Sequence, residues 1–140
     1  MGTLDTVTAF NDALNAQQWG EVARYLTDDF VFSGVTPQPV GKQEFIVAQQ
    51  QWTAGAPDWH VTLENLRVEG NTVQATSYIT GTHTNTLSLP GLPPIPATGH
   101  HFETRDASTA TLRADQLASL TITPGSPDIL EQLGVPMPPR

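Results

Sequence analysis

Hydrophobic residues recur every three or four positions over the first part of the chain, which is the spacing of amphipathic helices. The first of these helices is predicted over residues 4–16, behind Thr3 as its N-cap. Its apolar positions are Leu4, Val7, Phe10 and Leu14. A similar pattern over residues 42–53 places Gln49 on a side that is otherwise apolar. Because a polar group in that position needs a partner, Gln49 is a candidate ligand-binding residue.

Between these two segments, the pattern predicts a short helix and then a brief strand. The apolar face of the short helix comprises Trp19, Val22, Tyr25 and Leu26. The pair Asp28 and Asp29 is expected to end it, and residues 30–32 are expected to form the strand. Three helices are therefore expected ahead of the long strands.

From residue 58 onward the spacing changes to alternation, which is typical of strands with one buried face. The first long strand contains a bulge near Glu64 and Asn65, where the alternation changes phase, and ends at a hairpin turn over residues 69–71. The remaining elements are expected over residues 73–83, 102–112 and 117–123 as strands and over 126–134 as a short helix. Helices followed by antiparallel strands indicate an α+β fold.

Length and composition favour one domain spanning residues 1–140. The net charge of −8 repels phosphates and anionic surfaces, so neither nucleic acid nor a membrane is expected as a partner. The chain contains no cysteine, which excludes disulfides and thiolate chemistry. The first residues lack the features of a signal peptide, and we expect a cytoplasmic location.

His83 and Asp106 are the candidate catalytic residues. Each lies on the strand face that also carries apolar side chains, and their strands are consecutive, so we expect both to point into one cavity. A carboxylic acid in an apolar pocket serves as a general acid or base, and an imidazole beside it orients the substrate or stabilises an oxyanion. The alternative is structural: Asp106 pairs with Arg105 or Arg113 at a sheet edge, and His83 is a hydrogen-bonded sheet residue.

Other chemistry finds little support in the sequence. No nucleotide-binding, serine-hydrolase or zinc-protease motif is present, so no cofactor is expected. The four histidines lack the spacing of a ligand set, so no metal site is expected either. A small hydrophobic molecule is the expected partner, and the aromatic residues expected to line its pocket are Phe32, Trp52, Trp59 and Phe102. The loop over residues 89–99 is expected to close that pocket or to pack against a second subunit.

Five motifs occur along the chain in a characteristic order. They are Pro-Asp-Trp-His-Val at 57–61, Val-Glu-Gly-Asn-Thr-Val at 68–73, Gly-Thr-His-Thr at 81–84, a proline-rich loop ending at Thr98 and Gly99, and Leu-Glu-Gln-Leu-Gly at 130–134. Together they resemble the SnoaL-like polyketide cyclase family of the NTF2-like superfamily. The resemblance implies a cone of three N-terminal helices packed on a curved antiparallel sheet that encloses a pocket, and a homodimer formed through the sheet.

The resemblance also implies a cofactor-free reaction, the intramolecular aldol closure of a polyketide ester by an acidic residue and a nearby histidine. His83 matches the family's histidine, whereas the acidic position falls on Ser108, with Asp106 two residues earlier on the same face. Either Asp106 takes over the acid/base role and Ser108 contacts the substrate, or the chemistry is lost and the domain only binds a small apolar ligand. A third hypothesis is hydrolysis or isomerisation of a small hydrophobic substrate by the same residues.

Overall fold

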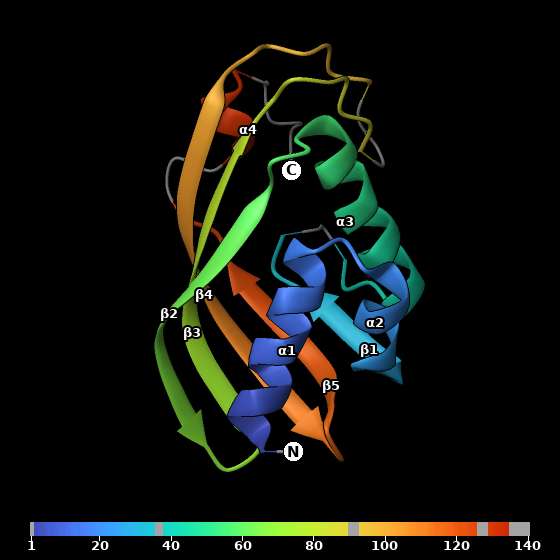
Figure 1. Ribbon diagram of the computed structural model, residues 1–140, viewed down its shortest axis with the longest axis vertical. Coiled ribbons are helices and arrows are strands. Elements are labelled where there is room, and N and C mark those ends of the chain that lie inside the picture. The colour runs from blue at the N-terminus through green and yellow to red at the C-terminus, as the bar shows by residue number, and fades with distance from the viewer. Residues whose placement is uncertain (1, 36–37, 90–92, 126–128, 135–140) are drawn as a thin grey trace.

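The computed structural model describes residues 2–35, 38–89, 93–125 and 129–134. Its helices are α1 (Thr3–Asn15), α2 (Trp19–Arg24), α3 (Lys42–Gly55) and the short α4 (Ile129–Gln132). Its strands are β1 (Leu26–Ser33), β2 (His60–Glu69), β3 (Thr72–Thr82), β4 (His101–Arg113) and β5 (Gln116–Thr123). Figure 1 shows α1, α2 and α3 gathered on one side of a long, twisted sheet. The predicted α+β class with three N-terminal helices is confirmed.

The five strands lie in the order β1-β5-β4-β3-β2. Neighbouring strands from β2 to β5 run antiparallel, but β1 pairs with β5 in parallel, so the sheet is mixed. The sheet is antiparallel as expected except at this edge, where β1 runs parallel to β5. Alternation within a segment indicates a strand and its buried face, but it carries no information on the direction of a partner that lies far along the chain.

The segment after α2 also differs from its prediction. Helix α2 ends at Arg24, and Asp28 and Asp29 lie within β1 instead of ending a helix. The backbone N–H of Leu117 donates to the carbonyl of Tyr25 at 2.7 Å, so sheet pairing begins directly after the helix. Leu26 is fully buried in β1. As an apolar residue it continues the spacing of the apolar face of α2, so the sequence pattern assigned it to that helix.

The other helix predictions need smaller corrections. Helix α1 begins at Thr3 itself, and Gly2 takes the N-cap position, with no side-chain cap. The hydroxyl of Thr6 instead donates to the carbonyl of Gly2 at 3.1 Å. Helix α3 begins at Lys42 as expected and continues to Gly55. The predicted helix over 126–134 lies partly outside the described residues, which include α4.

Strands β3 and β4 follow the alternation that the sequence predicts, and so does β2 before its bulge, whereas Leu66 and Val68 beyond the bulge are exposed. The register of β2 against β3 shifts between Glu64 and Arg67, and Asn65 has a φ of 54°, which confirms the bulge. Gly70, with a φ of 60°, occupies the predicted hairpin turn. The inward positions of β4 are all buried and comprise Phe102, Thr104, Asp106, Ser108, Ala110 and Leu112. One face of β4 therefore presents both polar and apolar side chains to the interior.

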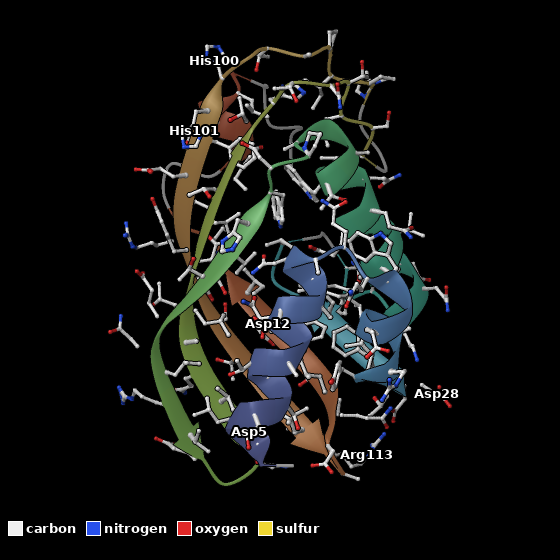
Figure 2. The ribbon with its side chains drawn as sticks, viewed as in Figure 1. Asp5, Asp12, Asp28, His100, His101 and Arg113 are labelled. Carbon is white, nitrogen blue, oxygen red and sulfur yellow. The ribbon has the colours of Figure 1, made fainter. Side chains whose placement is uncertain are left out.

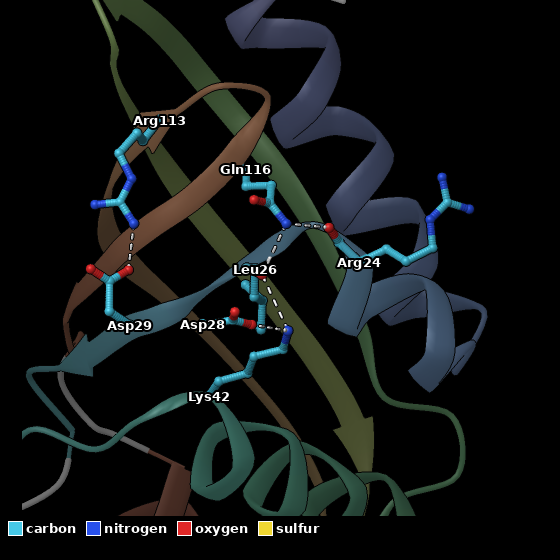
Figure 3. A network of polar contacts seen from close by, with 7 residues as sticks. All are labelled: Arg24, Leu26, Asp28, Asp29, Lys42, Arg113 and Gln116. Atoms are coloured by element: carbon cyan, nitrogen blue, oxygen red, sulfur yellow. Dashed lines mark hydrogen bonds and ion pairs between the residues drawn. The ribbon is translucent and has the colours of Figure 1, made fainter.

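A network of side-chain hydrogen bonds supports the irregular junction between β1 and β5 (Figure 3). The register of this pair shifts between Leu26 and Val31, which interrupts the regular ladder. The Gln116 amide donates to the carbonyls of Arg24 and Leu26 at 2.9 and 3.2 Å, and Lys42 Nζ donates to the latter at 3.2 Å. These side chains donate to carbonyl groups at the end of α2 and the start of β1, next to the irregular part of the ladder.

Buried apolar residues form two clusters. The larger one lies between α1, α3 and the sheet, where the ring of Phe45 packs against those of Phe10, Phe30 and Phe32. The smaller one is centred on Trp59, whose ring lies 5.3 Å from that of Trp52 and 5.9 Å from that of Phe102.

Most charged side chains lie on the outside of the fold, and Asp106 is buried. Figure 2 labels Asp5, Asp12, Asp28, His100, His101 and Arg113, all of which lie at the surface. Among the described residues, no helix combines the length and the apolar character needed to cross a membrane.

Candidate active site

A cavity of about 180 Å³ lies between the two apolar clusters. Helix α1 contributes Val7, Phe10 and Leu14 to its wall, α3 contributes Phe45 and Trp52, and the inward face of the sheet forms its floor. Its polar lining residues are Asn11, Gln49, Ser77, Asp106 and Ser108. An engineered apolar cavity of roughly 150 Å³ binds benzene, so this one has room for a molecule of at least one ring.

Asp106 is the one ionisable side chain among the described residues that line the cavity. The residue is 7% exposed, and its Oδ1 accepts hydrogen bonds from the Thr104 hydroxyl at 3.2 Å and from the backbone N–H of Gly125 at 2.8 Å. Oδ2 has no hydrogen-bond partner among the described residues. One oxygen of the carboxylate is thus held in place while the other remains available to a ligand.

Gly125 lies two residues after the end of β5 and packs against β4, which brings its backbone N–H to Asp106. A Cβ atom at Gly125 would lie 2.3 Å from the carbonyl oxygen of Arg105, so only glycine fits against this strand. Arg105 itself points outward, where it forms an ion pair with Glu64 at 3.0 Å and stacks on the Tyr78 ring at 4.1 Å. The alternative in which Asp106 pairs with Arg105 or Arg113 does not match this geometry, because Arg113 pairs with Asp29.

Two serines lie beside Asp106 on the cavity floor. Ser77 is directly opposite Asp106 in the register of β3 and β4, and Ser108 follows two residues later on the same face of β4. Their hydroxyl oxygens are 2.5 Å apart, and both residues are buried. Ser108 was a candidate from the sequence, whereas Ser77 was not. Alternation assigned Ser77 to the inward face, but only the register reveals that it faces Asp106.

The other predicted lining residues mostly reach the cavity. Phe32, Gln49, Trp52 and Trp59 all line it. The side-chain amide of Gln49 has no hydrogen-bond partner among the described residues, so it is available to a ligand in the cavity. Asn11, which the sequence did not single out, also lines the cavity, but its amide donates to the carbonyl of Val61 at 3.0 Å.

His83 does not join Asp106. Its backbone N–H donates to the carbonyl of His100, and the six-residue offset between His100 and Asp106 corresponds to roughly 20 Å along a strand. The expectation that both side chains point into one cavity is therefore wrong. Face alternation was correct for both residues, but it does not specify how far apart they lie along the strands.

His83 instead binds the loop that joins β3 to β4. It is 1% exposed, and its Nδ1 accepts the backbone N–H of Thr98 at 3.3 Å and lies 3.0 Å from the Thr98 hydroxyl. Its Nε2 is buried without a partner among the described residues. These contacts match the structural alternative for this residue, except that His83 lies one residue beyond the end of β3.

Phe102 also lies outside the cavity wall. It is opposite Gly81 in the β3–β4 register, and a Cβ at Gly81 would lie 2.5 Å from the ring. The ring therefore packs over the glycine and against Trp59 in the smaller core cluster, so the expected ligand contact of Phe102 is not found.

Three surface groups away from the cavity, Tyr78, Asp29 and Arg113, have shifted pKa values, and the pKa of Arg113 is raised by its hydrogen bond to Asp29. The pKa of Tyr78 is raised, chiefly because its hydroxyl donates a hydrogen bond to Glu103. The Arg113 guanidinium lowers the pKa of Asp29 by hydrogen bonding to its carboxylate.

Comparison with known proteins identifies the class to which this fold and cavity belong. The sequence pattern of the SnoaL-like domain matches residues 7–120, so the chain belongs to the SnoaL-like domain family. No curated protein sequence matches it.

Solved structures agree on the fold. IdmH from Streptomyces antibioticus, a proposed polyketide cyclase, superposes with a TM-score of 0.77 at 21% identity, over 96% of this chain and 100% of that one. A SnoaL-like polyketide cyclase from Agrobacterium tumefaciens superposes with a TM-score of 0.75 at 18% identity, over 96% and 99%. An NTF2-like protein of unknown function from Cytophaga hutchinsonii gives 0.64 at 17% identity, over 89% and 90%. The fold is NTF2-like.

Proposed function

We propose that this SnoaL-like domain is a small-molecule enzyme that removes a proton from a carbon next to a carbonyl group, with Asp106 as the general base and no cofactor. The observation that carries the proposal is the place of this carboxylate in the cavity. It is the one ionisable group among the described lining residues, and its Oδ2 is available to a ligand. A positioned carboxylate of this kind accelerates proton transfer by about 10²–10⁴-fold.

The reaction that suits this site and family is cyclisation of a polyketide ester by intramolecular aldol addition. Asp106 Oδ2 takes the proton from the carbon, and the resulting enolate carbon attacks a second carbonyl of the same substrate. The alkoxide formed in that step takes the proton back from Asp106, so the base is regenerated and no co-reactant is needed. Trp52 and Trp59 supply flat apolar surfaces against which a ring can pack.

His83 has a different place in this proposal from the one expected. Because it lies too far along the strands to contact a substrate at Asp106, we assign it a positioning role, in which it holds the loop after β3 through Thr98. Ser108, at the position where the family has its acid, contacts the substrate beside Asp106.

Proton abstraction can be tested without knowing the natural substrate. A panel of neutral β-keto esters and cyclic ketones is incubated with the protein in D₂O, and loss of the α-proton signal is followed by NMR. We expect the wild-type protein to accelerate exchange for at least one compound, and Asp106→Asn to slow it by about 10²-fold or more without loss of binding. The matched control is Asp115→Asn, which changes an exposed carboxylate in the turn before β5.

The second candidate function is a binding module, favoured by the mostly apolar lining and by a serine at the family's acidic position. Panel compounds that bind to the wild-type protein but show no accelerated exchange would support it over catalysis. Exchange at an unchanged rate in Asp106→Asn would remove Asp106 from the mechanism.

A further inference from the structure

The Ser77–Ser108 pair presents a hydrogen-bond donor to the cavity. The two hydroxyl oxygens are 2.5 Å apart, and the residues are 6% and 8% exposed. Each hydroxyl carries one hydrogen, and only one of the two hydrogens can lie between the oxygens. Neither hydroxyl has another partner among the described residues. The second hydrogen is therefore left for a group in the cavity, which both serines line.

The distance between the serine pair and Asp106, the proposed base, suits a carbonyl substrate. Directly opposite residues on antiparallel strands have Cβ atoms about 4.5–5.5 Å apart, which applies to Ser77 and Asp106. Ser108 lies two residues from Asp106 on the same strand, or roughly 6–7 Å. In a carbonyl compound, the acidic C–H and the oxygen are separated by a single carbon atom. One substrate can therefore place its C–H at the carboxylate and its oxygen at the serine pair.

We infer that the Ser77–Ser108 pair binds the carbonyl oxygen of the substrate and stabilises the enolate oxygen that forms when Asp106 removes the proton. This inference rests on the proposed function. In the step, the proton passes to Asp106 Oδ2, the electron pair of the C–H bond forms the new C=C bond, and the π pair of the carbonyl moves onto oxygen. The single negative charge thus moves from the carboxylate to an oxygen beside the pair, where a hydrogen bond from a buried hydroxyl stabilises it.

Other polar lining groups are less suited to this task. The cavity has no Lys, Arg or His among its described lining residues, so no cation is available to stabilise the enolate. Asn11 lies on α1, away from the strand that carries Asp106, and its amide donates one hydrogen bond to the carbonyl of Val61. Gln49 lines the cavity from α3, whereas Asp106 and the two serines lie together on neighbouring strands of the sheet.

The test uses 4-nitrophenol as a probe in an Asp106→Asn background. The ionised form of 4-nitrophenol resembles an enolate, and the asparagine at position 106 resembles the protonated base. Visible absorbance shows whether the bound probe is ionised. Nitrobenzene is the neutral control of the same shape. We expect the Asp106→Asn variant to bind 4-nitrophenol mainly in its ionised form. Adding Ser77→Ala and Ser108→Ala to this variant should weaken binding of the ionised form about tenfold or more, whereas binding of nitrobenzene should not change. Thr109→Ala, which removes an outward hydroxyl from β4, should have no effect.

Single variants test whether either hydroxyl can donate without the other. Each leaves one hydroxyl free to donate, so Ser77→Ala or Ser108→Ala alone should retain affinity for the ionised probe within about threefold. Loss of the full effect in one single variant would identify a lone donor and overturn the pair.

The two proposals can fail separately. If Asp106-dependent exchange is found but removal of both serines changes neither exchange nor nitrophenolate binding, the serine pair is overturned and the proposed function stands. If compounds bind without exchange, the proposed function fails, and the enolate role of the pair fails with it. A lower kcat for exchange in the double serine variant, with a smaller change in KM, supports both.

Discussion

The hydrogen bond from Gly125 to Asp106 depends on the absence of a side chain. A Cβ atom at this position would lie 2.3 Å from the Arg105 carbonyl oxygen and 3.1 Å from the Thr104 hydroxyl. Gly125→Ala must therefore push the chain away from β4 and lengthen the 2.8 Å bond to the carboxylate. We expect it to reduce the free energy of unfolding by about 1–3 kcal/mol, measured by urea denaturation, and to slow α-proton exchange.

Gly20→Ala is the control for this change. Gly20 lies within α2, and a Cβ atom added there would have no neighbouring atom within 4 Å. Alanine at this position should therefore stabilise the protein by about 0.5–1 kcal/mol. Equal effects of the two substitutions would show that the close approach to β4 is not what requires glycine at position 125.

Single residues also show what the sequence could predict about the site. Asp106, Gln49, Trp52 and Ser108 were placed correctly because strand alternation and helical spacing specify which face a side chain occupies. The position of His83 relative to Asp106 was predicted wrongly, because the distance between them depends on the register that the loop between β3 and β4 imposes. Ser77 was missed for the same reason, since a small polar residue on an inward face looks like any core position until its cross-strand partner is known.

At the scale of the elements, Gln116 links three of them. Its amide bonds to the carbonyls of Arg24 at the end of α2 and Leu26 at the start of β1, from the first residue of β5. Gln116→Ala leaves both carbonyls without this donor, so we expect a loss of about 1–3 kcal/mol in the free energy of unfolding, measured by urea denaturation. Gln74→Ala, an exposed position on β3, is the control and should change stability by less than about 0.5 kcal/mol. Equal losses in both variants would contradict a special role for the junction.

The elements themselves were predictable where the local pattern was long. Strands β3 and β4 alternate over more than ten residues each, and the bulge in β2 was visible as a change of phase. Strand β1 was recognised only over part of its length because its first residues continue the apolar spacing of α2, and its parallel pairing with β5 joins segments about ninety residues apart. Long-range pairing of this kind leaves no trace in local spacing.

At the scale of the whole molecule, charge affects assembly and stability more than fold. The expected homodimer through the sheet stays a prediction, which a measurement of mass in solution would check. The outward face of β3 and β4 includes Tyr78, Glu103 and Arg105. The Tyr78 hydroxyl donates a hydrogen bond to Glu103, and the Arg105 guanidinium stacks on the Tyr78 ring, so these polar groups have partners within the chain.

The excess of acidic residues makes a prediction about salt. Fourteen Asp and Glu oppose six Lys and Arg, whereas the four ion pairs among the described residues involve mostly exposed side chains. Exposed ion pairs contribute about 0–1 kcal/mol each to stability, so little is lost when salt screens them. The same salt screens the repulsion between the excess acidic residues over the entire surface, which stabilises the fold. We expect Tm at pH 7 to rise between low salt and physiological NaCl, with each kcal/mol of relieved repulsion worth about 2–4 °C. Repeating the measurement near the isoelectric point of about 4.6, where net repulsion vanishes, should abolish the increase. A Tm that falls with salt at pH 7 would mean that the ion pairs, Arg113 with Asp29 foremost, outweigh the net charge.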